Sequence, residues 1–468
     1  MLCRKDSGVF MFTFIELVNF KSFGEIRFDF KKSNTEFKKF IAIYGENGSG
    51  KSNFVSSIEL LSKLMTSFIR LDKLQKLKQA FESNKDNPEL LSEDLISQII
   101  NSDENSNSFK PCRMIGVTED TKVTYGFQIN GIEGHYTIAF NDNSITKEEL
   151  YYLTNKQRGY LFKLSNENDI INTSFSSYLF ANETYKQYVE KTIDMYWGKH
   201  TLLSLFLGEL KDKNFSFVID NISHNCIDVI DNFMNIFILC KSSRNFHTEI
   251  ISGSNIDIRD FQKVQIEGKN SKKKKQLDII GKVINEFYTQ AYTDIIKVYY
   301  KQIAKSNDSN KVYTYKLFVD KIVYGQIRTI PFDLESAGTQ KVLTVLRAII
   351  EAINGQTVVY DEIDDGIHDL LMTNILLSVQ DDITGQLILT THNTLLLEDL
   401  NPKAAYVIYV DDQGNKEARC FDDYDIRIQQ SNNQRKLYLN GVFGGIPFSN
   451  KIDYSCMHMV YKDTDAEG

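Results

Sequence analysis

This chain of 468 residues has only 5 prolines, and it lacks clustered cysteines and long apolar runs. Its 6 cysteines are scattered, with no C-x-x-C pair and no cluster with histidine. This excludes a disulfide scaffold and a structural zinc site, and it fits a reducing cytosol. No stretch approaches the roughly 18 apolar residues of a membrane span. The apolar residues 9–15 resemble a weak signal peptide, but Glu16 interrupts them and no small-residue cleavage site follows, which favours a strand. We therefore expect a cytoplasmic protein without membrane contact.

Acidic residues slightly outnumber basic ones: 62 aspartates and glutamates face 54 lysines and arginines, a formal charge of −8. This balance argues against a protein that coats nucleic acid, although it allows one local basic groove. Hydrophobic residues make up 42% of the chain and aromatic residues 12%, so wholesale disorder is excluded. At about 150 residues per domain, the length suggests two to four domains or subdomains.

The first third of the chain has the pattern of strands that lead into a long helix. Apolar residues recur at helical spacing from Ser52 to about Phe81. Alternating patterns around Asn130-Gly131 predict a hairpin. Strand-like patterns cover four further segments: residues 12–20, 25–30, 40–44 and 160–164.

The middle of the chain has a different pattern. In residues 166–310 strand patterns fade and apolar residues recur at steps of three and four, without a sustained heptad. Strand patterns return in residues 311–468. We therefore predict a helical insertion at 166–310 that separates an N-terminal half, residues 1–165, from a C-terminal half, residues 311–468.

The most specific pattern is a phosphate-binding loop. The segment Gly45-Glu46-Asn47-Gly48-Ser49-Gly50-Lys51-Ser52 matches G-x-x-x-x-G-K-[ST], follows a strand-like run and opens a helical pattern. Glycines let backbone N–H groups surround phosphates, and the helix N-terminus adds a favourable dipole. Lys51 would neutralise the β- and γ-phosphates, and Ser52 would ligate Mg²⁺. The predicted nucleotide-binding residues are Gly45, Asn47, Gly48, Ser49, Gly50, Lys51, Ser52 and Asn53.

A second pattern supplies acids for hydrolysis. The apolar run Thr357-Val358-Val359-Tyr360 ends at Asp361 and Glu362, as a Walker B element does. Asp361 would hold the Mg²⁺ shell, and Glu362 would activate the attacking water. An Asp-Glu pair at the end of a strand is common, so by itself the pattern fits an ordinary strand end about equally well.

Two further patterns fit a nucleotide site. A strand-like run delivers His392, whose imidazole would bond a γ-phosphate. The turn Glu335-Ser336-Ala337-Gly338 opens an apolar-periodic helix, where Ser336 and Gly338 would bind a phosphate. Taken singly, His392 fits a structural histidine and Ser336 fits a plain helix cap.

The order of these four patterns resembles the ABC-type ATPase heads of the SMC/RecF/OLD group. The signature differs from their L-S-G-G-Q at Glu335, Ala337 and Thr339. The resemblance implies an α/β fold, namely a mixed β-sheet with flanking helices and an inserted helical domain, that binds ATP and Mg²⁺. Their Q-loop has only Gln128 as a candidate here. Two shorter matches are a D-loop at Asp364-Asp365-Gly366-Ile367-His368 and an N-F-[KR]-S opening at Phe20-Lys21-Ser22-Phe23.

Within that group the chain looks most like AbiLi/RloA-like bacterial ATPases. The tail from Arg435 to Phe448 is similar to their R-x-x-Y-L-x-G-x-[YF]-G-x-[IV]-P ending. Such proteins typically begin near Met11, which makes residues 1–10 an extension or the result of an alternative start. This family is associated with phage defence, and its members are often encoded beside a small TOPRIM-like or RloB-like partner.

Each nucleotide element occurs once in the chain, and in the group it resembles the signature of one subunit completes the P-loop site of another. The resemblance therefore implies an ATP-dependent homodimer. Lys51 and His392 of one chain, with Ser336 and Gly338 of the other, would hold each γ-phosphate. No nuclease or zinc pattern follows His392, so we expect a separate effector protein, a nuclease or toxin.

Two roles stay open at this point: an anti-phage switch that controls the effector, or a RecF/SMC-like DNA-binding ATPase in repair or maintenance. The basic run Lys269-Asn270-Ser271-Lys272-Lys273-Lys274-Lys275 bears on the choice. It fits a solvated loop, or in the DNA-binding alternative a patch that contacts phosphates. The intact Glu362 argues against a third role, a nucleotide-gated scaffold with negligible turnover.

Overall fold

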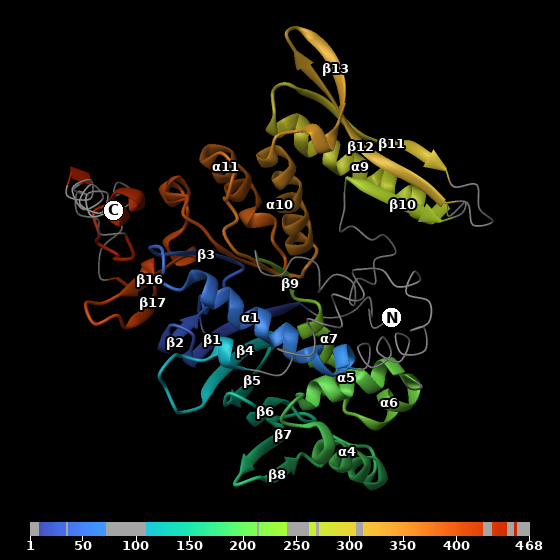
Figure 1. Cartoon of the computed structure of the whole chain (residues 1–468), viewed down its shortest axis with the longest axis vertical. Coiled ribbons are helices and arrows are strands. Elements are labelled where there is room, and N and C mark those ends of the chain that lie inside the picture. The colour runs from blue at the N-terminus through green and yellow to red at the C-terminus, as the bar shows by residue number, and fades with distance from the viewer. Residues whose placement is uncertain are drawn as a thin grey trace, which may run out of the picture.

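The computed structural model describes residues 9–33, 36–71, 109–212, 215–240, 262–267, 271–305, 312–424, 433–446 and 454–455, and every structural statement below refers to these residues. In them, strands form three sheets flanked by helices (Figure 1). The predicted α/β class with mixed sheets is confirmed. No described helix combines the length and the apolar character needed to cross a membrane.

A six-stranded sheet carries the nucleotide-binding patterns. Neighbouring strands are parallel, apart from β17, which is antiparallel to β16 at one edge. Parallel strands are covered on both faces, which explains why they have continuous apolar sequences. The order across the sheet is β17 (Lys416–Cys420), β16 (Ala405–Val410), β3 (Phe40–Tyr44), β15 (Gln386–Thr390), β14 (Thr357–Tyr360) and β9 (Phe237–Leu239).

Alternate residues of these strands pack into two different cores. Ile41 and Ile43 of β3 belong to one core, together with helix α1 (Lys51–Met65). Ala42 and Tyr44 belong to the other. The alternation follows from the period of two in a strand, and it fixes the sheet between two helical layers. The second core is closed by α10 (Ala337–Ile353) and α11 (Asp369–Val379).

A seven-stranded antiparallel sheet packs on the other side of α1 (Figure 1). The hydroxyl of Tyr125 in this sheet donates to the Ser57 carbonyl of α1. The predicted hairpin is confirmed, and Asn130 and Gly131 at its turn have φ of 53° and 80°, as a type I′ turn requires. The strand order is β2 (Phe23–Asp29), β1 (Phe10–Phe20), β4 (Thr121–Ile129), β5 (Ile132–Phe140), β6 (Ile145–Leu153), β7 (Arg158–Glu167) and β8 (Ile170–Phe175).

The stretch expected to be a helical insertion contains strands as well as helices. Strand β8 (Ile170–Phe175) belongs to the antiparallel sheet, β9 completes the central sheet, and two other strands enter a separate four-stranded sheet, so the stretch predicted as a helical insertion is only partly helical. The helices are α4 (Glu183–Tyr196), α5 (Leu202–Asp212), α6 (Phe215–Asn221), α7 (His224–Met234) and α9 (Ser271–Ala291). The separate sheet comprises β10 (Lys263–Glu267), β11 (Ile295–Lys305), β12 (Val312–Val323) and β13 (Gln326–Pro331). The domain boundaries at 165 and 310 stay a prediction.

Two helix predictions need correction at their ends. The first helix ends at Met65, with a turn at Thr66 before a further helical stretch to residue 71, and residues 72–81 lie outside the described residues. The basic run begins α9 instead of forming a loop: Lys272 to Lys275 lie in its first turns, while Lys269 and Asn270 lie outside the described residues. A first turn of lysines opposes the helix dipole, so sequence rules did not favour a helix start there.

Short helices complete the described residues. The C-terminal helix α12 (Gln434–Leu439) belongs to the tail whose sequence resembles the AbiLi/RloA-like ending. The 3₁₀ helices are η2 (Lys110–Cys112), η4 (Phe332–Leu334), η5 (Gln380–Asp382), η6 (Thr394–Glu398), η7 (Pro402–Ala404) and η8 (Phe421–Asp423).

Candidate functional site

The P-loop joins β3 to α1 in a conformation that its glycines make accessible. Gly48 and Gly50 have φ of 83° and 117°, where residues with a side chain are strained. A Cβ at Gly50 would lie 2.5 Å from Cζ of Phe23. Gly50 is also the N-cap of α1 and provides no side-chain cap. The first N–H groups of α1 are therefore left for an anion, which is how a helix N-terminus binds phosphate.

Lys51 lies buried at the centre of this loop. Its Nζ donates to the carbonyl oxygens of Gly45 at 2.7 Å and Glu46 at 3.0 Å. Burial lowers the pKa of Lys51, while Glu362 and Asp361, in that order, raise it. The structure thus brings the P-loop lysine into the electrostatic field of the Walker B acids, although more than 300 residues of sequence separate them.

The other predicted P-loop residues differ in their surroundings. Asn47 and Gly48 are exposed. Ser49 is 1% exposed, and its hydroxyl has no hydrogen-bond partner in the part of the chain that the structure describes. Ser52 is exposed in the first turn of α1, and Asn53 donates from Nδ2 to Ser22 Oγ at 2.7 Å. The exposed Ser52 hydroxyl and the buried Ser49 hydroxyl both lie beside the first N–H groups of α1. This arrangement fits a loop that binds phosphate.

The Walker B acids follow β14, and Thr390 of the neighbouring strand holds both. The Thr390 hydroxyl donates to Oδ1 of buried Asp361 at 2.7 Å. The Glu362 N–H donates to the same hydroxyl at 2.7 Å. Glu362 has φ of 51°, the left-handed region that a residue with a side chain rarely adopts. The turn after β14 is therefore a constrained structure and not an ordinary strand end.

His392 lies at the same end of the central sheet. Its backbone N–H donates to Oδ2 of Asp364 at 3.1 Å. Burial lowers the pKa of His392, and the charge of Lys51 lowers it further, against the acids Asp364 and Glu362. The imidazole is therefore neutral at pH 7 and has one N–H to donate. Lys51, the two Walker B acids and His392 thus form one cluster, as the sequence patterns predicted.

The predicted signature residues lie elsewhere. Ser336 is the N-cap of α10, and its hydroxyl accepts from the Thr339 N–H at 3.1 Å. A Cβ at Gly338 would lie 2.6 Å from the carbonyl oxygen of Gly366, so only glycine fits against the D-loop match. In Figure 1 the N-terminal end of α10 lies toward the β12–β13 hairpin, apart from the start of α1. Within one chain, this helix end packs on the turn of the D-loop match, where Lys341 Nζ pairs with Asp365 at 2.6 Å.

Sequence patterns missed Lys416, which contacts the P-loop from β17. Its Nζ donates to the Gly48 carbonyl at 2.9 Å and to Ser22 Oγ at 2.8 Å. Burial lowers the pKa of Lys416, and Glu46 partly offsets this. Only the pairing of β17 with β16 brings this lysine to the loop, because the P-loop and β17 lie at opposite ends of the sequence. A lone lysine in an edge strand carries no signal of its own.

We expect Lys416→Ala to weaken ATP binding by about tenfold, since a charge-assisted hydrogen bond is worth about 1.5–3 kcal/mol. The loop would lose the contact that fixes Gly48. The dissociation constant measured by titration with a fluorescent ATP analogue checks this. Lys403→Ala, which removes an exposed lysine paired with Asp422, is the control and should leave the affinity unchanged. Equal affinities for all three proteins would contradict the expectation.

The C-terminal tail also packs against the P-loop and the strand before it. The rings of Tyr438 and Tyr44 lie 5.7 Å apart, and the Tyr438 hydroxyl donates to the Gly445 carbonyl at 2.9 Å. A Cβ at Gly445 would lie 3.4 Å from Cα of Gly45 and 2.2 Å from Cγ2 of Val407. The glycines of the tail are therefore required by close packing beside the loop.

The residues present fit a magnesium ion bound together with a nucleotide. Among the described residues, no group of three or more His, Cys, Asp and Glu side chains is placed to hold a metal. Mg²⁺ is usually held by one or two protein oxygens, with substrate phosphates and waters as the remaining ligands. The exposed Ser52 hydroxyl and the Asp361 carboxylate are a donor set of that kind.

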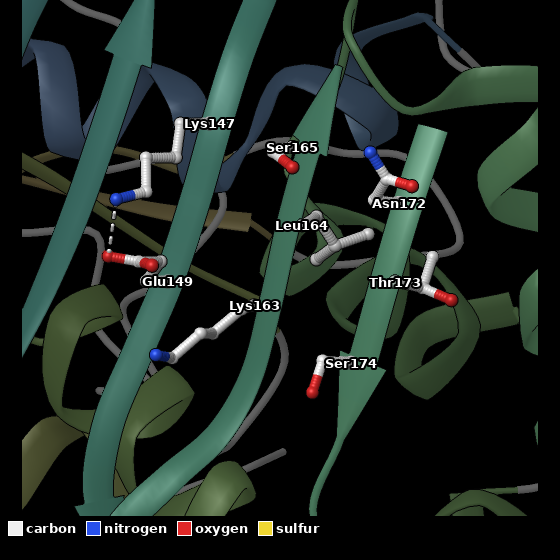
Figure 2. A pocket seen from close by; sticks show the side chains of 8 residues that line it. All are labelled: Lys147, Glu149, Lys163, Leu164, Ser165, Asn172, Thr173 and Ser174. Carbon is white, nitrogen blue, oxygen red and sulfur yellow. Dashed lines mark ion pairs between the residues drawn. The ribbon is translucent and has the colours of Figure 1, made fainter. Parts of the chain in front are cut away.

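A groove on the antiparallel sheet is distinct from this cluster. Figure 2 shows it over β6, β7 and β8, where Lys147 Nζ pairs with Glu149 at 3.1 Å. None of the predicted nucleotide-binding residues lines it. The lining residues are Lys147, Glu149, Lys163, Leu164, Ser165, Asn172, Thr173 and Ser174.

Solved structures similar to this chain include SMC head domains and a RecF protein, all at low identity. The Smc head domain with an extended coiled coil from Pyrococcus furiosus has 14% identity and a TM-score of 0.40, and the match covers 88% of this chain and 96% of that one. The SMC head domain from Thermotoga maritima has 13% identity and a TM-score of 0.34, covering 87% and 98%. The recombination mediator protein RecF has 11% identity and a TM-score of 0.34, covering 88% and 99%. No curated protein matches the chain.

A protein-family model gives the assignment. The model described as "AAA domain, putative AbiEii toxin, Type IV TA system" matches residues 40–398, which run from β3 to beyond His392 and include all four nucleotide patterns. The closer relation to AbiLi/RloA-like proteins stays a prediction. Because the match covers well over half of its length, the chain belongs to this AAA-domain family, which fits the predicted nucleotide-binding patterns.

Proposed function

We propose that this protein is an ATP-driven dimerising switch that acts in bacterial anti-phage defence and controls a separate effector. One observation carries the proposal: Lys51, Glu362 and His392 interact at one end of the central sheet. The N-terminal end of α10, which Ser336 caps, lies toward the β12–β13 hairpin and apart from the start of α1 (Figure 1). One chain then holds two incomplete halves of a nucleotide site. A second copy, turned by a twofold axis, would complete both.

The residues of the cluster have separate tasks in this proposal. Lys51 exchanges its bonds to loop carbonyls for bonds to phosphate oxygens, and neutral His392 donates to the γ-phosphate. Glu362 accepts a proton from the attacking water. Mg²⁺, held by Ser52 and Asp361, would neutralise phosphate charge. Loss of the γ-phosphate removes the group that both chains bind, so the dimer opens, a rigid-body switch.

Light scattering tests the switch on the full chain. With a slowly hydrolysed ATP analogue and Mg²⁺, we expect the mass to double from the 53.9 kDa of one chain, because the analogue keeps the γ-phosphate that joins the halves. ADP serves as the control and should leave a monomer. An unchanged mass with a saturating analogue, under conditions where binding is demonstrated, would contradict the proposal.

The defence role has a separate test. It is supported by the family description, which names a toxin and a toxin–antitoxin system, and it requires a partner protein that carries the toxic activity. Co-purification of a neighbouring gene product, for example a TOPRIM-like or RloB-like protein, with loss of phage protection when either gene is deleted, would support it. Full protection by this chain alone would contradict control of a separate effector.

Exposed lysines at the start of α9 favour the alternative, a DNA-binding ATPase. Lys272, Lys274 and Lys275 are exposed in its first turns. In that role, DNA binding should be stimulated by ATP, weaken steeply with salt, and fall when Lys272 and Lys275 are replaced by glutamate. DNA binding with these three properties would replace the defence switch as the better account.

A further inference from the structure

We propose that Thr390 is a positioning residue for hydrolysis: one buried hydroxyl sets the backbone of Glu362 and the carboxylate of Asp361 together, and links both to the strand that leads to His392. This inference rests on the proposed function, because it takes Glu362 as the base and Asp361 as the magnesium ligand. Nothing in the sequence patterns marked Thr390, which lies in the apolar strand β15.

The direction of the two hydrogen bonds is fixed by chemistry. A hydroxyl has one hydrogen to donate and lone pairs that accept. The Glu362 N–H can only donate, so the Thr390 oxygen accepts it at 2.7 Å. The hydroxyl hydrogen is then free for Oδ1 of Asp361, also at 2.7 Å. Thr390 is 0% exposed, so water does not compete for either bond.

The backbone of Glu362 needs such a restraint. Its φ of 51° lies in the left-handed region, and a residue with a side chain stays there only when its surroundings hold it. The next N–H, that of Ile363, donates to the Thr390 carbonyl at 3.2 Å. Two successive N–H groups of the turn after β14 are thus bound to one residue of β15, so Thr390 determines where the turn directs the Glu362 side chain.

The same strand end continues toward the γ-phosphate sensor. Two residues after Thr390, the N–H of His392 donates to Asp364 Oδ2, which belongs to the same turn. The C-terminal end of β15 and the residues after it therefore contact both the first and the later residues of the turn after β14. Thr390 holds the acids, and the bond from His392 holds the residue that leads into the D-loop match. A shift of His392 on phosphate release would be transmitted to the acids through these bonds.

An isosteric substitution isolates the hydroxyl. Thr390→Val keeps the shape of the side chain but leaves Oδ1 of Asp361 and the Glu362 N–H without these bonds. We expect kcat for ATP hydrolysis to fall by about 10- to 100-fold, and the Mg²⁺ concentration for half-maximal rate to rise several-fold. The dissociation constant for ATP should change by less than about threefold, because the P-loop is untouched.

Two further variants separate positioning from stability. Thr390→Ser retains the hydroxyl and should restore kcat to within about threefold of wild type. Thr357→Val removes another buried hydroxyl, which donates to the Phe10 carbonyl at 2.8 Å at the start of β14, and should leave kcat unchanged. Unfolding by circular dichroism shows whether the two valine variants lose similar stability. A purely structural Thr390 would lower stability without changing the Mg²⁺ dependence.

The experiment measures steady-state hydrolysis against Mg²⁺ for wild type and the three variants, with ATP affinity measured in parallel. Low kcat together with a raised Mg²⁺ requirement in Thr390→Val, and recovery of both in Thr390→Ser, supports the inference. Wild-type kcat in Thr390→Val, or equal loss in both variants, overturns it. Failure of the proposed dimerisation gives a different result, because wild type would then stay monomeric with ATP. The kcat values of Thr390→Val and Thr390→Ser would still decide the role of Thr390. A wild type without any turnover overturns both.

Discussion

Replacement of Glu362 by glutamine is expected to lower ATP turnover by at least about 100-fold and to trap an ATP-bound dimer, since general-base catalysis contributes about 10²–10⁴ in rate. Glutamine has the shape of glutamate, so the constrained backbone of the turn is kept. The amide takes no proton from water, so the γ-phosphate that joins the two chains persists. With ATP, the dimer of this variant should therefore persist. The wild-type dimer should be transient, because wild type hydrolyses the ATP.

Turnover and mass measured on the same samples check this expectation. The control is Glu417→Gln, an equivalent change at an exposed carboxylate of β17 that pairs with Arg419. It should leave both properties as in wild type. Turnover near the wild-type rate in Glu362→Gln would show that another group accepts the proton. Lost turnover with a monomeric mass would separate hydrolysis from dimerisation and contradict the switch.

The parts of this site that sequence predicted are those whose information is local. The P-loop needs glycines at fixed spacing, a preceding strand and a following helix, all within about 30 residues. The Walker B strand and the strand before His392 are short apolar runs that end in polar residues. Their common edge follows from the parallel pairing of β14 with β15. That Lys51, Glu362 and His392 lie together did not follow from local patterns, and it was implied only by the resemblance of their order to that of ABC-type ATPase heads.

The parts that sequence missed depend on contacts between distant segments. Strand β9 has three residues, Phe237 to Leu239, too few to show a period, and only its register with Val358 to Tyr360 reveals it. Strand β11 has neighbouring apolar residues such as Ile295 and Ile296, which fit helical spacing as well as a strand. Thr390 is a threonine in an apolar strand, and its role appears only when Asp361 is placed opposite it.

Mixing two inactive variants should restore about one quarter of wild-type ATPase activity, which is the expectation for random pairing of chains in a twofold dimer. Lys51→Ala removes the phosphate-binding lysine. Ser336→Asp places a carboxylate where the partner's γ-phosphate would lie, and aspartate is as good an N-cap as serine, so α10 should keep its start. Each variant alone has two defective sites. In a mixed dimer, the intact P-loop of one chain meets the intact signature of the other.

A second mixture provides the matched control for shared sites. Lys51→Ala and Glu362→Gln both act on the same side of the proposed site, so a mixed dimer of these chains has no intact site and activity should stay absent. Equal melting temperatures of Ser336→Asp and wild type would show that the cap survives. If activity recovers in the first mixture and not in the second, Lys51 of one chain and Ser336 of the other must act at the same site. No recovery in either mixture, with mixed dimers demonstrated, would mean that each chain completes its own site, and recovery in both would mean that Lys51 and Glu362 serve different sites.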